Sequence, residues 1–210
     1  MPASEVRGEG LFLRLHPELL ADWTTRVAAT PELDAHQHAY RQFRQNRYSD
    51  RITADFDPLR GWPGPGYYLL HTLSHLLIRA IALECGYGAA SLSERIYAGT
   101  AEQPRQGILI YTAVPDAEGT LGGLVALGEP DALDRILRRA FTDARNCSSD
   151  PLCAEHAPSP GDDFLHAAVC HICGFVSETT CERGNRFLDR RFLVPIGSPH
   201  LALVPAERWP

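Results

Sequence analysis

The sequence predicts an α+β fold, dominated by helices, in which a buried central helix packs with a small sheet and a cysteine-rich segment closes the C-terminal end. Residues 67–84 are apolar on most sides, which is typical of a helix in the middle of a domain. Residues 107–114 form a short apolar run that is typical of a buried strand. Five of the six cysteines lie between positions 147 and 181, where helical and strand periodicity is weak.

The composition is that of a soluble globular protein. The 210 residues are 44% hydrophobic and 22% charged, and a chain of this length can bury a core without disulfides. No apolar run reaches about 18 residues without a charge, so no membrane-spanning helix is predicted. Charged residues and a histidine interrupt the first apolar stretch, residues 11–20, which therefore does not resemble a signal peptide. We expect a cytoplasmic protein with reduced thiols.

The first third of the chain is expected to contain one strand and two helices. Residues 10–15 have the composition of a short strand. Prolines open the helices predicted over residues 17–29 and 31–48, because proline suits the first turn of a helix. Residues 53–66 contain closely spaced prolines and glycines and are expected to form a loop.

The middle of the chain contains the predicted core elements. The central helix over residues 67–84 ends at the glycines that follow it. Ser91 and Glu94 have capping-box spacing, which predicts a short helix through residue 97. The buried strand follows at 107–114, and residues 124–127 fit either a short strand or the first turn of the next helix.

The last third divides into a helix and a metal-binding segment. Residues 130–146 predict an amphipathic helix with apolar side chains on one face. The chain is then irregular, apart from a final helix expected over residues 182–192. We therefore divide the chain into a helical α+β core region, residues 1–146, and a C-terminal segment, residues 147–210, packed on the same domain.

The cysteine spacing indicates a metal site. The clustered cysteines are Cys147, Cys153, Cys170, Cys173 and Cys181. A C-x2-C pair such as Cys170 and Cys173 lets two thiolates reach one ion, and Zn²⁺ prefers four nitrogen or sulfur ligands. We favour a closed, structural zinc site over an iron–sulfur cluster or a thioredoxin-like redox pair. Spacing alone does not decide which four residues bind, and Cys85 is expected in the core.

Other polar residues have a functional and a structural interpretation. His71 and His75 share one helix face, but the glutamate of a metalloprotease motif is absent, so we interpret both as hydrogen-bonded core residues. Asp116 and Glu118 follow the buried strand and could bind Mg²⁺ in a nuclease, although turn chemistry explains them as well. The chain contains no G-K-[ST] phosphate-binding motif and thus no recognisable ATP site.

Nucleic-acid contact would need a local basic patch, because the net charge is −6. All basic residues are arginines, and two groups stand out: Arg41, Arg44, Arg47 and Arg51 recur at helical spacing, and Arg183, Arg186, Arg190 and Arg191 follow the cysteine cluster. Either group could follow a phosphate backbone or form a solvated, ion-paired face.

Long stretches of the chain resemble a known family. The matching stretches are residues 70–79, 84–97, 107–123, 147–153, 170–173 and 181–190. They resemble the MrfA-type zinc-binding (MZB) domain of bacterial helicase-related proteins. The likeness extends to the C-terminal part of DrmB-type proteins, the helicase-associated subunits of the DISARM anti-phage system, and covers nearly the whole chain.

The resemblance implies a ligand set and a cofactor. Zinc would be held by Cys153, Cys170, Cys173 and Cys181, with Cys147 as the alternative to Cys153. Asn185, Leu188 and Asp189 match the family's Asn and Leu-Asp after the last cysteine.

The resemblance also implies a function. We expect a non-catalytic, zinc-binding, helicase-associated module that assists DNA binding or unwinding with the helicase subunit of an anti-phage defence complex. Its DNA contacts would come from the arginines at positions 183, 186, 190 and 191, which are nearest to the metal. The alternatives are a metal-dependent nuclease that uses Asp116 and Glu118, and a protein–protein adaptor without DNA contact.

Overall fold

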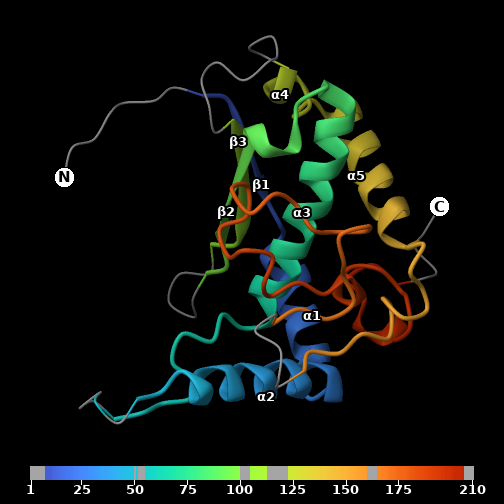
Figure 1. Cartoon of the computed structure of the whole chain (residues 1–210). Helices are drawn as coiled ribbons and strands as arrows, with labels where there is room; N and C mark the ends of the chain where they lie inside the picture. The colour runs from blue at the N-terminus through green and yellow to red at the C-terminus, as the bar shows by residue number, and fades with distance from the viewer. Residues whose placement is uncertain are drawn as a thin grey trace.

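The computed structural model describes residues 8–49, 51, 55–99, 105–112, 123–159 and 165–205. Among them the helices are α1 (Pro17–Val27), α2 (Pro31–Asn46), α3 (Pro65–Cys85), α4 (Gly123–Ala126) and α5 (Pro130–Ala144). The strands are β1 (Gly10–Arg14), β2 (Leu92–Tyr97) and β3 (Gly107–Thr112), and the 3-10 turns are η1 (Ala89–Ser91), η2 (Arg190–Phe192) and η3 (Pro199–Leu201). The predicted helix-dominated α+β class is confirmed. In Figure 1, α3 stands between the sheet and α5, and α2 crosses below them.

The sheet has one face in the core and one face toward solvent. β3 is the middle strand and pairs antiparallel with β1 and β2. The register places Leu11 opposite Ile110 and Ile96 opposite Ile108, and all four side chains are buried. The aromatic residues on the other face are exposed, as expected for an antiparallel sheet covered on one side.

Helix α3 is the centre of the core. Fourteen of its 21 residues are buried, between Tyr67 and Ile81, and they surround the helix axis. Pro65 stands in its first turn, and Gly86 ends it in the left-handed conformation at φ 71°, which glycine adopts without strain. Among the described residues, no helix combines the length and the apolarity that crossing a bilayer requires.

Two predicted helices are wrong. Residues 92–97 form strand β2, because their burial alternates with period two, and the buried positions include Glu94. A charged residue on the core face hid the alternation in the sequence. Residues 182–192 are mostly irregular, because Asn185 and Phe187 have positive φ angles of 57° and 61°, which interrupt a right-handed helix. Only η2 remains of the predicted final helix.

The irregular C-terminal segment is anchored to the N-terminal helices. The Trp23 indole donates a hydrogen bond to the Leu201 carbonyl oxygen at 2.7 Å, and the Arg26 guanidinium donates one to the Ala202 carbonyl oxygen at 2.7 Å. Phe192 packs edge-to-face against Trp23 and belongs to the main core. The segment therefore shares one hydrophobic core with the helices, whereas the domain division at residue 147 stays a prediction.

Asp189 holds a buried ion-pair network at the start of η2. Its carboxylate accepts hydrogen bonds from the His36 ring at 2.9 Å and from the Arg191 guanidinium at 2.7 Å, and its backbone N–H donates to the Thr72 hydroxyl. Asp189 is fully buried. Burial opposes its ionisation, but the His36 hydrogen bond and the Arg191 charge outweigh that effect and lower the pKa of Asp189 to about 2.

We expect Asp189→Asn to lower the free energy of unfolding by about 3–5 kcal/mol, because it leaves the buried Arg191 cation without its counter-charge. Urea denaturation measures the change. Asp134→Asn is the control: it breaks an exposed pair with Arg138 and should cost less than about 0.5 kcal/mol. Equal effects of the two variants would show that the network does not stabilise the fold. In the parent protein the stabilisation by Asp189 is complete above about pH 4 and disappears as the pH falls toward 2.

Candidate metal centre

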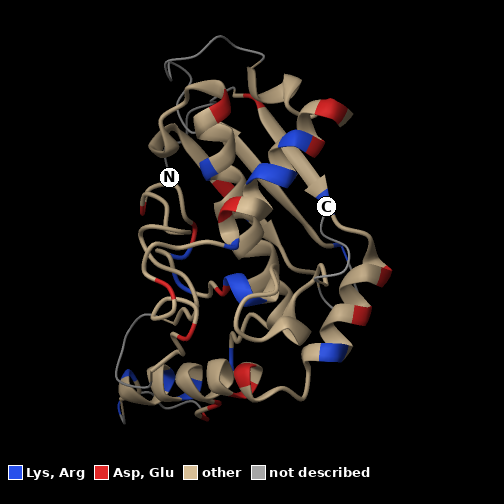
Figure 2. Cartoon of the chain, turned by 90° about the vertical axis from the view of Figure 1, so that its right-hand side faces the viewer, with Lys and Arg blue, Asp and Glu red and all other residues tan. Residues whose placement is uncertain are grey.

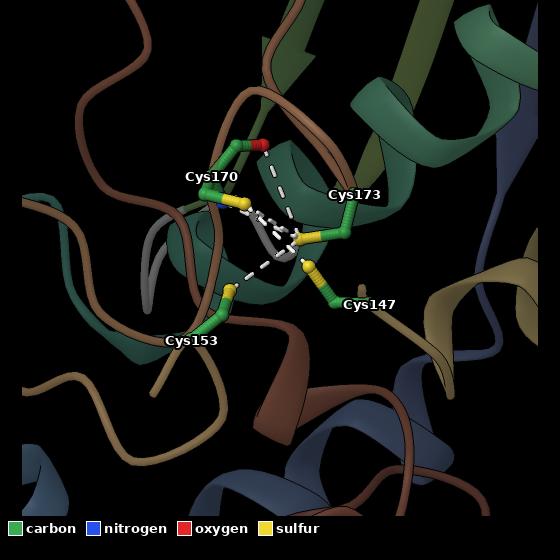
Figure 3. A group of neighbouring side chains, drawn as sticks. All are labelled: Cys147, Cys153, Cys170 and Cys173. Atoms are coloured by element: carbon green, nitrogen blue, oxygen red, sulfur yellow. Dashed lines mark hydrogen bonds between the residues drawn. The ribbon is translucent and has the colours of Figure 1, made fainter. Parts of the chain in front are cut away.

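Four cysteine sulfurs converge close to the C-terminal end of α5, where the C-terminal segment begins. Cys147, Cys153, Cys170 and Cys173 point toward one another (Figure 3), and their sulfur atoms all lie within 4.8 Å of each other. The separations are 3.6 Å between Cys147 and Cys170, 3.7 Å between Cys153 and Cys173, and 3.9 Å between Cys170 and Cys173. All four are free thiols. We call this group the four-cysteine centre.

The four-cysteine centre has the dimensions of a zinc site. A zinc ion with sulfur ligands at about 2.3 Å in a tetrahedron separates the sulfurs by about 3.8 Å. The three sulfur–sulfur distances above, 3.6, 3.7 and 3.9 Å, lie on either side of that value. The residues therefore fit a tetrahedral zinc ion with four thiolate ligands, which would leave no open coordination position.

The C-x2-C turn positions two of the sulfurs. The backbone N–H of Cys170 donates to the Cys173 sulfur at 3.3 Å, and the N–H groups of Gly174 and Phe175 donate to the Cys170 carbonyl oxygen. Gly174 has no room for a side chain, because a Cβ there would lie 2.3 Å from Val169 Cγ2. From α3, the Arg79 guanidinium donates to the carbonyl oxygens of Ile172 and Phe175 and fixes the turn.

The protein surroundings of the four-cysteine centre disfavour thiolates at two of its cysteines. Burial raises the pKa of Cys173 to about 11, and it raises the pKa of Cys153 further. At Cys170, burial is outweighed by backbone N–H groups of Cys173 and Ile172, and the pKa is about 7. A divalent cation supplies the charge that ionises such buried thiols, so metal binding and proton release are linked here.

Arg190 joins the two cysteine loops. Its guanidinium donates to the carbonyl oxygens of Ala144 and Ala168, each at 3.0 Å, and forms an ion pair with Asp150. Ala144 ends α5, and Asp150 also accepts from the backbone N–H of Cys147 at 3.0 Å. Arg190 is completely buried, and its positive charge favours the thiolates of Cys153 and Cys173.

The structure places the predicted nucleic-acid residues in different environments. Arg190 and Arg191 are buried and use their guanidinium groups in internal bonds, so the prediction that these two contact DNA is not supported. Arg183 is exposed and Arg186 is half-buried. Asp116 and Glu118, the residues of the nuclease alternative, lie outside the described residues.

The structure brings together three of the four implied metal ligands and separates the fourth. Cys153, Cys170 and Cys173 lie in the four-cysteine centre, together with Cys147, which the sequence had offered as the alternative. Cys181 lies in another buried group, with His71, His75 and Glu94. Cys181 was implied as a ligand by the family resemblance, and nearness to the C-x2-C pair favoured Cys153 over Cys147, whereas the structure places both Cys147 and Cys153 in the centre and Cys181 outside it.

Comparison with known proteins agrees with the geometry. Residues 73–174 match the model of a family described as the MrfA Zn-binding domain, MZB. This segment is similar to an MZB domain. All four residues of the four-cysteine centre lie within the matched region, and Cys181 lies beyond its end. The zinc predicted from the cysteine spacing is therefore the cofactor of this domain.

The chain is also similar to a curated protein along most of its own length. The chain is 37% identical over 199 residues to the DISARM protein DrmB of Bacillus paralicheniformis (strain ATCC 9945a / NCIMB 11709 / CD-2), an alignment that covers 92% of this chain. The chain spans 33% of the length of that relative. The similarity includes the helical region before the matched MZB segment as well as the segment itself.

Two features of the site were missed by sequence reasoning. The role of Arg190 was hidden because arginines are usually exposed, and no local pattern marks a buried one. The group around Cys181 was hidden because Glu94 was assigned to a helix. A signal existed for the second group, because His71 and His75 stand at i and i+4 on the most buried helix.

Proposed function

We propose that this chain is a non-catalytic, zinc-stabilised module of an anti-phage defence complex that helps a helicase subunit to hold DNA. The observation that carries the proposal is the 37% identity to the DISARM protein DrmB over 92% of the chain. The closed thiolate sphere supports a structural rather than a catalytic zinc, because four cysteines leave no position for water or substrate. Free thiolates need a reducing compartment, which supports a location in the cytoplasm.

A basic surface at the C-terminal end of α2 supports DNA contact. The two arginine groups of the sequence meet there: the Arg47 guanidinium lies 3.9 Å and the Arg186 guanidinium 5.7 Å from the centre of the Phe43 ring. Arg183 lies over the Tyr67 ring at 5.7 Å, and Arg44 over Phe56. We call Arg44, Arg47, Arg183 and Arg186 the arginine surface.

The charge distribution along α2 strengthens this assignment. Its first turn contains Glu32 and Asp34, and its arginines follow in the C-terminal half. In Figure 2 the lowest helix accordingly has red at one end and blue toward the other. Arginines interleaved with aromatic rings can contact phosphates and stack with unpaired bases, so the surface suits single-stranded DNA or a strand junction. Asp55 lies beside it and reduces its net charge.

We expect the full chain to bind a single-stranded oligonucleotide with an affinity that falls steeply as salt increases. Replacing both Arg47 and Arg183 with alanine should weaken binding and reduce the slope of log affinity against log salt by about 1–2, because each lost phosphate contact removes about one released counterion. Fluorescence anisotropy at several salt concentrations measures the slope.

Arg138→Ala is the matched control, because Arg138 is exposed on α5 and pairs with Asp134 one turn earlier on the same helix. This variant should leave unchanged both the affinity for the oligonucleotide and the slope of log affinity against log salt. An absence of binding at low salt, or an equal effect of Arg138→Ala, would contradict DNA contact through the arginine surface. Salt-independent capture of a helicase subunit without DNA binding would instead identify the chain as a protein–protein adaptor.

A further inference from the structure

A second group of metal-ligating side chains lies about the middle of α3, apart from the four-cysteine centre. His71 and His75 come from α3, Glu94 from the core face of β2, and Cys181 from the irregular segment. Their ligand atoms all lie within 4.8 Å of one another, and all four residues are buried. We call this group the His–Glu–Cys centre.

The contacts within the His–Glu–Cys centre converge on the ring nitrogens that face inward. His71 Nε2 lies 2.8 Å from Glu94 Oε1 and 3.1 Å from Cys181 Sγ. His75 Nε2 lies 3.4 Å from the same Glu94 oxygen. Two imidazole nitrogens, a carboxylate oxygen and a sulfur therefore surround one point.

The outward ring nitrogens fix the tautomers. His71 Nδ1 lies 3.3 Å from the Phe187 carbonyl oxygen, and His75 Nδ1 lies 2.9 Å from the Gly174 carbonyl oxygen. Because a carbonyl oxygen can only accept, each Nδ1 carries a proton, and in a neutral ring Nε2 then offers its lone pair to the centre. A backbone carbonyl on the far ring nitrogen is the usual arrangement for metal-binding histidines.

Some polar atoms of the centre have no hydrogen-bond partner in the described part of the chain. These atoms are His75 Nε2 and Glu94 Oε2, and both residues are at least 97% buried. An unpaired buried acceptor is costly. Cys181 is prepared as a thiolate, because its sulfur accepts the backbone N–H groups of Arg183 at 3.4 Å and Asn185 at 3.2 Å.

The arrangement differs from a nucleophile with its base. In a catalytic triad the nucleophile and the orienting carboxylate contact opposite nitrogens of the histidine. Here Cys181 and Glu94 both contact Nε2 of His71, and the Phe187 carbonyl oxygen occupies the other side. The histidines have no exposed surface that a substrate could reach. A bound cation explains why four ligand atoms share one side.

We propose that the His–Glu–Cys centre binds a second zinc ion, which joins α3, β2 and the segment around Cys181. A carboxylate, a thiolate and two neutral imidazoles have a charge of about −2, which a divalent ion balances inside the core. A tetrahedral zinc ion separates nitrogen from oxygen by about 3.3 Å and nitrogen from sulfur by about 3.5 Å. The three distances given above, 2.8, 3.1 and 3.4 Å, differ from these separations by about half an ångström or less.

The two centres are physically connected. Gly174, whose carbonyl oxygen accepts from His75, directly follows the ligand Cys173 of the four-cysteine centre. A metal at one centre therefore orders a residue beside the other. We expect the thermal unfolding temperature of a variant that has lost the second ion to fall, even when the four-cysteine centre is loaded.

Metal analysis of the purified full chain tests the proposal. By plasma mass spectrometry we expect about two zinc ions per chain, and about one in Glu94→Gln and His75→Ala. Cys85→Ser is the matched control, because Cys85 belongs to neither centre, and it should keep about two ions.

Cobalt substitution assigns each ion to its centre. Thiolate-to-cobalt charge-transfer absorption reports the number of sulfur ligands, so Glu94→Gln should lose about one fifth of it and Cys170→Ser about four fifths. A native protein with a single zinc ion, or Glu94→Gln with unchanged metal content, would overturn the proposal and leave the centre as a proton-sharing network. The native stoichiometry decides even if a variant does not fold.

Discussion

Replacing Cys173 with serine will lower zinc content and stability together. A serine hydroxyl is a poor zinc ligand, and Cys173 is the buried member of the C-x2-C turn. Its sulfur lies 3.7 Å from the Cys153 sulfur and 3.9 Å from the Cys170 sulfur. Structural zinc contributes its binding energy to folding, so we expect the free energy of unfolding to fall by more than about 4 kcal/mol. Removing zinc from the native protein with a chelator should also lower the free energy of unfolding. Urea denaturation and metal analysis measure both effects.

Cys85→Ser provides the comparison for the Cys173 variant. Cys85 is partly buried at the end of α3, and within the described parts of the chain the hydrogen bond of its sulfur is a long one, 3.8 Å to the Gly123 carbonyl oxygen. We expect unchanged zinc and a loss of less than about 1 kcal/mol. If Cys173→Ser kept full zinc occupancy, or lost no more stability than Cys85→Ser, the ligand assignment would be wrong.

Replacing Arg190 with methionine will weaken both the fold and the zinc site. The variant removes a fully buried cation, and with it the guanidinium that donates to the carbonyl oxygens of Ala144 and Ala168 and pairs with Asp150. Loss of one partner of a buried ion pair costs about 3–5 kcal/mol. Because Arg190 supports the thiolates from outside the coordination sphere, zinc affinity should fall about 10–100-fold. Competition with a chromogenic chelator measures the affinity.

Arg183→Met separates this role from nucleic-acid contact. Arg183 is exposed and stacks on Tyr67, so its loss should change stability by less than about 1 kcal/mol and leave zinc affinity unchanged. The effects on DNA binding should be reversed. Among the folded proteins, Arg183→Met should weaken the complex with DNA and Arg190→Met should not. If Arg190→Met had the stability of the native protein, Arg190 would not be the residue that holds the two cysteine loops together.

The sequence predicted the parts of the fold that depend on local pattern. The central helix and strand β3 were found because their apolar residues are contiguous, and zinc was found because the C-x2-C pair is a local motif. The remaining ligands depend on where an irregular segment leads. The family resemblance implied Cys181, and Cys147 stood only as the alternative to Cys153, but the course of the chain places Cys147, shortly after α5, beside Cys170.

The missed features share one physical cause: a polar residue in the core resembles a surface residue in the sequence. Glu94 gave β2 the pattern of a capped helix, although it faces the core between two histidines. Arg190 resembled part of a basic patch, although it is enclosed by carbonyl oxygens. Burial of charge is decided by tertiary partners, which come from distant positions in the chain.

Anomalous diffraction at the zinc absorption edge from crystals of the full chain tests the central claim most directly. We expect a strong peak about 2.3 Å from each of the four sulfurs of Cys147, Cys153, Cys170 and Cys173. Density for a disulfide within this group, or a zinc peak coordinated by Cys181 in place of Cys147, would contradict the account.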